Sequence, residues 1–166
     1  MLIVFSGLPG TGKTTLAREV ARQAGAVYLR IDVIEQAIRA AGVLAADVGA
    51  SGYAVANALA LSNLRQGLRV VADCVNPVQE SRAAWQATAA TAGVALLNVE
   101  VVCSDLSEHQ RRVDSRCGDI PGLTPPTWQA VQRHEYEPWD DTPVSVDTAR
   151  LSVAEAVATL LQHVLR

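Results

Sequence analysis

The fold is decided by residues 2–14, which read Leu2-Ile3-Val4-Phe5-Ser6-Gly7-Leu8-Pro9-Gly10-Thr11-Gly12-Lys13-Thr14. Residues 7–14 match the full pattern GxxxxGK[ST]. The match lies directly after a short apolar run and before the helical periodicity of Thr14–Ala24. In such a loop, glycines let backbone N–H groups turn inward around a phosphate, and the dipole of the following helix adds positive charge. The sequence therefore predicts a nucleoside triphosphate site, ATP with Mg²⁺, formed by Gly7, Leu8, Pro9, Gly10, Thr11, Gly12, Lys13, Thr14 and Thr15.

Two residues of this loop have predicted chemical roles. Lys13 is the only lysine of a chain that carries 14 basic side chains. A lysine at this position spans the β- and γ-phosphate oxygens, and the following hydroxyl, here Thr14, ligates magnesium. The alternative, a glycine-rich turn with an incidental lysine, is disfavoured by the complete motif and its flanks.

Beyond the loop, short apolar runs alternate with helical patterns to the end of the 166 residues. This alternation predicts an α/β domain spanning 1–166, with a parallel sheet covered by helices on both faces. The expected strands are Leu2–Phe5, Ala26–Ile31, Arg69–Ala72, Ala95–Val102 and Val144–Val146. The expected helices after the first are a stretch following Asp32, Ser51–Gln66, Val78–Ala92, a helix from about Ser107 that includes Arg116, Thr127–Tyr136 and Val153–Leu165.

Composition excludes several classes of protein. The net charge of −3 disfavours a nucleic-acid partner, which normally requires a basic surface. The three cysteines have neither the number nor the spacing of a disulfide framework or a zinc ribbon. The N-terminus lacks the features of a signal peptide, and no apolar run reaches the roughly 18 residues that would span a membrane. We therefore expect a cytoplasmic protein, and no pattern indicates an oligomeric state.

Four motifs in order carry a family resemblance. The phosphate loop is followed by Leu29-Arg30-Ile31-Asp32, by Val70-Val71-Ala72-Asp73, by an arginine-bearing helix and by Val146-Asp147-Thr148. This order resembles the zeta-toxin, chloramphenicol phosphotransferase and polynucleotide-kinase branch of small P-loop kinases, often described as AAA domain ATPases or as adenylylsulfate kinase-like. GTPases are excluded because their base-reading motif needs a second lysine, and AAA+ motors because they need a longer chain.

The resemblance, which covers nearly the whole chain, implies a three-layer P-loop NTPase fold. Its sheet would have five parallel strands in the order 2-3-1-4-5. A substrate-side helical insert would occupy about 33–67 and a lid about 105–126. The adenine would lie near Thr148.

The resemblance also implies roles for two aspartates. Asp32 would accept the proton of the substrate hydroxyl, and a plain N-cap of the following helix is the alternative, although both roles are compatible. Asp73 ends a strand and has the form of a carboxylate that holds Mg²⁺ beside Thr14. For Asp73 the alternative is an ordinary turn residue.

Two arginines are candidates for contacts with the transferred phosphate. Arg112 and Arg116 are four residues apart, so on one helix they would project from the same face, as the lid arginines of small kinases do. The alternative is a solvated basic face neutralised by Glu108 and Asp114.

The acceptor is predicted to be a small molecule with a hydroxyl group. Relatives tend to place an arginine one helical turn after the aspartate, whereas this chain has Glu35, which favours a neutral or cationic acceptor. We expect the acceptor cleft between Asp32, Asp73 and residues 40–53. The histidines are expected at the surface, the tryptophans in packing roles and Asn76 in a turn. Two competing functions are a polynucleotide 5′-hydroxyl kinase and a regulatory ATPase that transfers no phosphate.

Overall fold

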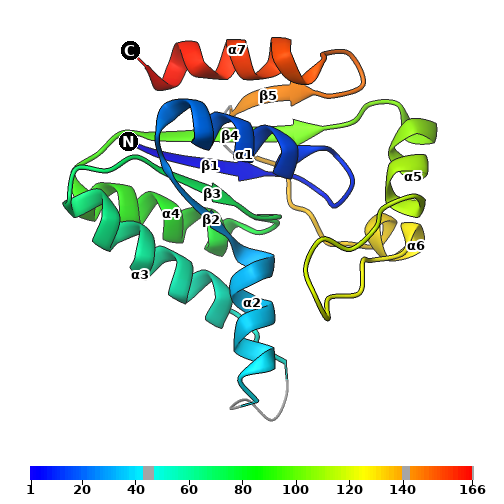
Figure 1. The fold of residues 1–166 in the computed structure, drawn as a ribbon, viewed down its shortest axis with the longest axis horizontal. Helices are drawn as coiled ribbons and strands as arrows, with labels where there is room; N and C mark the ends of the chain where they lie inside the picture. Colours follow the sequence, from blue (N-terminus) through cyan, green and yellow to red (C-terminus); the bar gives the residue numbers. More distant parts are fainter. Residues whose placement is uncertain (43–46, 140–142, 166) are drawn as a thin grey trace.

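The computed structural model describes residues 1–42, 47–139 and 143–165, and these contain a five-stranded parallel sheet in the order β2-β3-β1-β4-β5 (Figure 1). The strands are β1 (Leu2–Ser6), β2 (Val27–Arg30), β3 (Val70–Asp73), β4 (Leu96–Val102) and β5 (Val144–Asp147). All residues of β1 are buried, because this strand lies in the middle of a sheet that is covered on both faces. The predicted fold class and strand order are confirmed.

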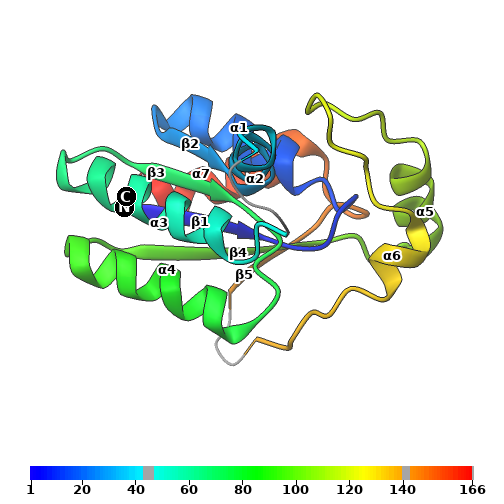
Figure 2. The same ribbon diagram turned by 90° about the horizontal axis from the view of Figure 1, so that it is seen from below.

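Helices cover the two faces of the sheet and one of its ends. They are α1 (Lys13–Ala24), α2 (Ile31–Ala40), α3 (Ser51–Arg65), α4 (Gln79–Ala92), α5 (Leu106–Asp114), α6 (Trp128–Gln132) and α7 (Val153–Val164). α1 and α7 pack on one face of the sheet, and α3 and α4 pack on the other. α5 and α6 lie beyond the carboxyl ends of the strands in both views (Figures 1 and 2). This end of the sheet is where ligands bind in parallel α/β folds.

The two faces of β1 build two separate cores. Ile3 and Phe5 belong to the core under α1 and α7, whereas Leu2 and Val4 belong to the core under α3 and α4. Trp85 of α4 is fully buried in the second core, which confirms its predicted packing role.

The start of α2 differs from the prediction. β2 ends at Arg30, which is paired with Asp73 in the sheet register, and the chain enters α2 at once. Arg30 is therefore the N-cap, and Asp32 lies in the first turn. The prediction that Asp32 caps the helix is wrong, because the strand ends one residue earlier than its apolar run.

Two helices are shorter than predicted. α5 ends at Asp114, so Arg116 follows the helix instead of lying on it. α6 ends at Gln132, because the next residues are held in an extended path. The buried guanidinium of Arg82 donates to the carbonyl oxygens of Glu137 at 2.7 Å and of Pro138 at 2.7 Å, and it stacks 4.1 Å from the ring centre of Trp139.

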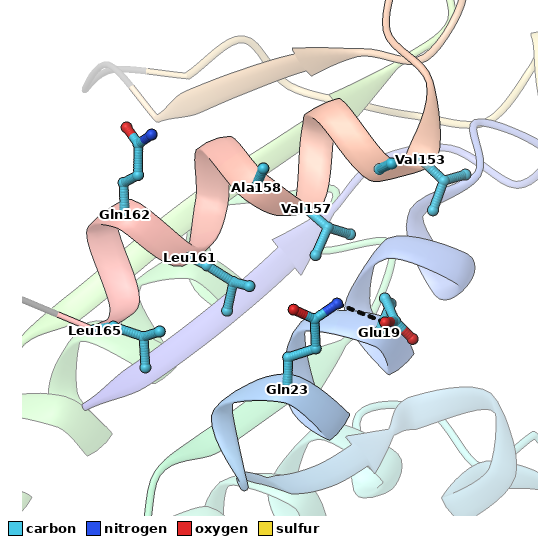
Figure 3. Close-up of a pocket in the computed structure, with 9 residues that line it drawn as sticks. Glu19, Gln23, Val153, Val157, Ala158, Leu161, Gln162 and Leu165 are labelled. Carbon is cyan, nitrogen blue, oxygen red and sulfur yellow. Dashed lines mark hydrogen bonds between the residues drawn. The ribbon is translucent and has the colours of Figure 1, made fainter.

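α1 and α7 also form an apolar groove of about 820 Å³ on the outer surface (Figure 3). Val157, Leu161 and Leu165 line it from α7, and Glu19 and Gln23, which share a hydrogen bond of 2.6 Å, line it from α1. In the part of the chain that the structure describes, no helix is both long enough and apolar enough to cross a membrane.

Candidate functional site

The phosphate loop connects β1 to α1 and has the backbone geometry that its glycines allow. Gly10 and Gly12 adopt φ values of 86° and 90°, in the left-handed region that L side chains rarely enter. A Cβ on Gly10 would lie 2.5 Å from Cγ2 of Val113, so α5 packs directly against the loop. A larger residue at position 10 would therefore separate α5 from the loop as well as strain the backbone.

His109 of α5 also holds the loop. Its ring is buried, its Nε2 lies 2.8 Å from the carbonyl oxygen of Pro9, and the ring of Trp128 packs edge-on at 5.0 Å. The expectation that His109 lies at the surface is wrong, because the face of α5 that carries it is turned toward the loop. α5 and α6 thus reach the nucleotide site through one histidine.

A second contact joins the loop to β5. The hydroxyl of Thr148 donates to the carbonyl oxygen of Thr11 at 2.7 Å and accepts from the Arg112 guanidinium at 2.8 Å. Arg112 also bonds Glu108 at 2.8 Å, and the arginines at positions 111 and 112 lower the pKa of Glu108 to about 2. Beside this contact lies a cavity of about 420 Å³, lined by Gly12, Thr15, Leu16, Arg112, Thr148, Leu151, Ser152 and Val153.

A cavity of about 280 Å³, here called the phosphate cavity, opens over the loop. Its lining residues are Leu8, Gly10, Gly12, Lys13, Thr14, Thr15, Arg18, Arg112, Arg116, Cys117 and Asp119. Arg112 and Arg116 thus face the same cavity as predicted, although Arg116 reaches it from the chain after α5. Gly7 and Thr11 are buried on the inner side of the loop.

Asp73 lies next to Lys13 at the end of β3. One carboxylate oxygen, Oδ2, accepts a hydrogen bond of 2.6 Å from the Tyr28 hydroxyl, and burial followed by the charge of Asp73 raises the pKa of Tyr28 well above its ordinary value. The other oxygen, Oδ1, is buried 3.7 Å from Nζ of Lys13 and has no hydrogen-bond partner among the described residues.

This donor set fits magnesium. An orphaned buried carboxylate oxygen suits a hard cation that prefers oxygen ligands, and Thr14 supplies a hydroxyl from the first turn of α1. Among the residues that the structure covers, no group of three His, Cys, Asp or Glu side chains could hold a metal. Such sparse protein ligation is typical of Mg²⁺ that is bound largely through nucleotide phosphates.

Asp32 is oriented by a buried arginine. Nε and Nη2 of Arg30 donate to Oδ2 of Asp32 at 3.3 and 3.2 Å, and Nη1 donates to Oδ2 of Asp119 at 2.6 Å. Only 1% of the Arg30 side chain is exposed, against 34% of Asp32 and 39% of Asp119. Arg30 therefore ties the aspartate after β2 to the segment that follows α5.

Asp32 and Lys13 line one small cavity of about 190 Å³, here called the inner cavity. Its other lining residues are Pro9, Val75, Arg116, Gly118, Asp119, Ile120, Leu123, Thr124, Pro125, Pro126 and His134. The expected wall from residues 40–53 is not found among the described residues of that segment, and residues 43–46 lie outside the description. The wall comes instead from residues 118–126.

Glu35 and Asn76 lie outside this cavity and have structural contacts. Glu35 bonds Arg39 at 3.2 Å and lies against Gly52, and burial raises the pKa of its carboxyl group. The fully buried Asn76 donates to Oγ of Ser6 at 3.0 Å and adopts a φ of 53°, which confirms its prediction as a turn residue.

Three residues of the site were not singled out from the sequence. Asp119 and Arg18 contribute to the phosphate cavity, and His109 positions the loop. For Arg18, helical spacing from Lys13 was the available signal, since five residues along a helix bring a side chain back toward the same side. Asp119 lies in a Gly- and Pro-rich loop, where sequence periodicity carries no signal.

The fold and the loop define a P-loop nucleotide-binding protein. The sequence profile of the AAA domain family matches residues 2–122, and the chain belongs to this family. The match confirms the family resemblance inferred from the motifs. A comparison with curated protein sequences gives no match.

Solved structures of kinases share the fold along nearly the whole chain. A candidate kinase of Chloroflexus aurantiacus superposes with a TM-score of 0.76 at 22% identity, covering 99% of this chain and 95% of that one. The Mycobacterium tuberculosis APS kinase CysC, in complex with AMPPNP and APS, gives 0.70 at 22% identity, with 99% and 96% covered. A gluconokinase of Sinorhizobium meliloti 1021 gives 0.68 at 21% identity, with 99% and 91% covered.

Proposed function

We propose that the protein is an ATP-dependent kinase that transfers the γ-phosphate to a hydroxyl group of a small molecule. The observation that carries this proposal is the contact between two cavities: the phosphate cavity and the inner cavity share Lys13, Arg116 and Asp119 as a common wall. A hydroxyl held beside Asp32 would thus lie next to the terminal phosphate of a nucleotide on the loop. The kinase folds of the solved structures support the same reaction type.

In this reaction the chain's own residues position and neutralise charge. Backbone N–H groups at the start of α1 and the ammonium group of Lys13 would bind the phosphates, with the adenine in the cavity beside Thr148. Thr14 and Asp73 would hold Mg²⁺, which neutralises the phosphate oxygens when bound. The acceptor oxygen forms a bond to the γ-phosphorus while the bond to the ADP oxygen breaks, and the hydroxyl proton passes to Asp32. Arg116 and Arg112 would stabilise the charge that develops on the transferred group.

The inner cavity supports a small acceptor without a strongly anionic group. Its volume of about 190 Å³ is below the roughly 300–1,000 Å³ of most ligand pockets. The buried guanidinium that faces it, Arg30, is already bonded to Asp32 and Asp119, so it has no charge free for a phosphate or carboxylate. We assign residues 118–126 as the part of the proposed lid that selects the acceptor.

An ADP-release screen tests the proposal. It would cover alcohols, sugars, sugar acids, nucleosides, antibiotics, adenylylsulfate and oligonucleotides, with Lys13→Ala as the matched inactive control. Stimulation by a small alcohol that Lys13→Ala abolishes is the expected result. Stimulation by oligonucleotides alone would instead indicate a 5′-hydroxyl kinase, and nucleotide binding with no stimulation by any acceptor would indicate a regulatory ATPase.

A further inference from the structure

Each cationic side chain that lines the phosphate cavity is already paired with a carboxylate of the same chain. The pairs are Lys13 with Asp73 at 3.7 Å, Arg112 with Glu108 at 2.8 Å, Arg18 with Asp119 at 2.9 Å and Arg116 with Asp119 at 3.8 Å. Asp119 differs from the other two carboxylates in one respect, because it lines the cavity itself. A carboxylate of the protein therefore occupies part of the surface that nucleotide phosphates would approach.

Asp119 lies at the border between the two cavities and is held as an anion. It lines the inner cavity as well as the phosphate cavity. The hydrogen bond from Arg30, with a further one from Arg18, holds the pKa of Asp119 well below its ordinary value. At neutral pH the terminal phosphate of a bound nucleotide would thus meet a full negative charge at this border.

The three arginines around Asp119 are held with unequal strength. Arg30 is buried and bonds Asp119 at 2.6 Å, so its contact is shielded from water. The Arg18 side chain is 52% exposed, and Arg116 approaches Asp119 only to 3.8 Å. Exposed or long ion pairs contribute little in water, so a phosphate can compete for these two arginines while Arg30 stays in place.

We propose that Asp119 is the resting-state counter-ion of Arg18 and Arg116, and that these two arginines transfer from Asp119 to the terminal phosphate when a nucleoside triphosphate binds. This proposal rests on the nucleotide site of the proposed function and adds Arg18 to the residues that contact the nucleotide. Asp119 keeps its bond to Arg30, so the partner of Asp32 is unchanged. The transfer requires a γ-phosphate, and it therefore predicts discrimination between triphosphate and diphosphate.

Calorimetric titration of magnesium AMP-PNP and of magnesium ADP tests this exchange in the wild type, Arg18→Ala and Asp119→Asn. Arg18→Ala should weaken AMP-PNP binding by about three- to tenfold, because one charged hydrogen bond to phosphate is lost, and should leave ADP within about twofold. Asp119→Asn should strengthen AMP-PNP binding by a similar factor and leave ADP unchanged. Asp114→Asn is the matched control, because Asp114 is an exposed aspartate at the end of α5 that lines neither cavity.

Each outcome decides the proposal. It is overturned if Arg18→Ala changes both nucleotides equally or neither, or if Asp119→Asn weakens AMP-PNP binding. Arg18 is exposed on α1, so Arg18→Ala keeps the test valid even if Asp119→Asn, which removes a partner of the buried Arg30, does not fold. A wild-type protein that binds neither nucleotide would refute the proposed function too, whereas binding without discrimination among the variants would refute only the exchange.

Discussion

Asp32→Asn removes the charge of the carboxylate and keeps its shape. In the structure Oδ2 of Asp32 accepts two hydrogen bonds from Arg30, and Asp32 lines the inner cavity together with Lys13. An amide oxygen can still accept from Arg30. The substitution therefore tests whether the negative charge at position 32 takes part in phosphate transfer.

The expected cost in stability is small. Arg30 keeps its bond of 2.6 Å to Asp119 and lies 3.9 Å from Asp73, so its buried charge remains compensated. The Asp32 side chain is 34% exposed, and a partly exposed pair contributes about 1 kcal/mol or less. For a chain of this length the melting temperature should fall by roughly 2–4 °C. Since Asp32 is not the N-cap, no capping energy is lost.

The expected loss of activity is much larger. General-base catalysis contributes about 10²- to 10⁴-fold, so transfer to the acceptor found in the screen should fall by at least about 10². AMP-PNP affinity should change little, because Asp32 does not line the phosphate cavity. The assay is ADP release at saturating ATP, with Asp114→Asn as the matched control. Transfer within about threefold of wild type, by a folded Asp32→Asn protein, would refute the base assignment and leave Asp73 as the candidate.

Other substitutions separate the remaining roles. Lys13→Ala should lower transfer by about 10²- to 10³-fold with an unchanged melting curve, because one charge contact to the phosphates is lost, and near-normal turnover would contradict the kinase proposal. Arg112→Ala should mainly raise the KM for ATP, since Arg112 bonds Thr148, whereas Arg116→Ala should mainly lower kcat, and steady-state kinetics that leave both parameters unchanged would mean a solvated basic surface. Asp119 has a lower pKa folded than unfolded, so its stabilising contribution is complete above about pH 4 and is lost as the pH falls through the folded value. The melting-temperature difference between wild type and Asp119→Asn should thus be constant near neutral pH and shrink in acid, and a difference that grows in acid would contradict the assigned sign.

The fold could be predicted because its signals are local. The phosphate loop is contiguous, and the alternation of apolar runs with helical periodicity needs no knowledge of long-range contacts. The end of β2 shows where this fails. Ile31 is apolar like the strand before it, and only the register that pairs Arg30 with Asp73 ends the strand at Arg30. A one-residue difference moved Asp32 from the predicted N-cap into the first turn of α2.

The position of His109 depended on a partner far away in the chain. On the sequence, α5 is a short polar helix, and nothing within it indicates which polar face is buried. The structure buries His109 because a carbonyl oxygen of the phosphate loop, at Pro9, provides a hydrogen-bond partner 100 residues away. A buried polar group needs such a partner, and the sequence does not show where it is.

The two halves of the site therefore differ in how far sequence can reach. The half that binds phosphate is one loop whose backbone does the binding, so a short motif is sufficient to predict it. The half that binds the acceptor is built from residues after β2 and from 118–126, and the bond of 2.6 Å between Arg30 and Asp119 joins positions 89 residues apart. Gly122 of the same segment lies so close to Gln36 of α2 that a Cβ there would be 2.7 Å from Nε2. Since the acceptor cavity exists only through these distant contacts, the reaction type follows from the motif, whereas the choice of acceptor follows from the way the 118–126 segment folds over Asp32.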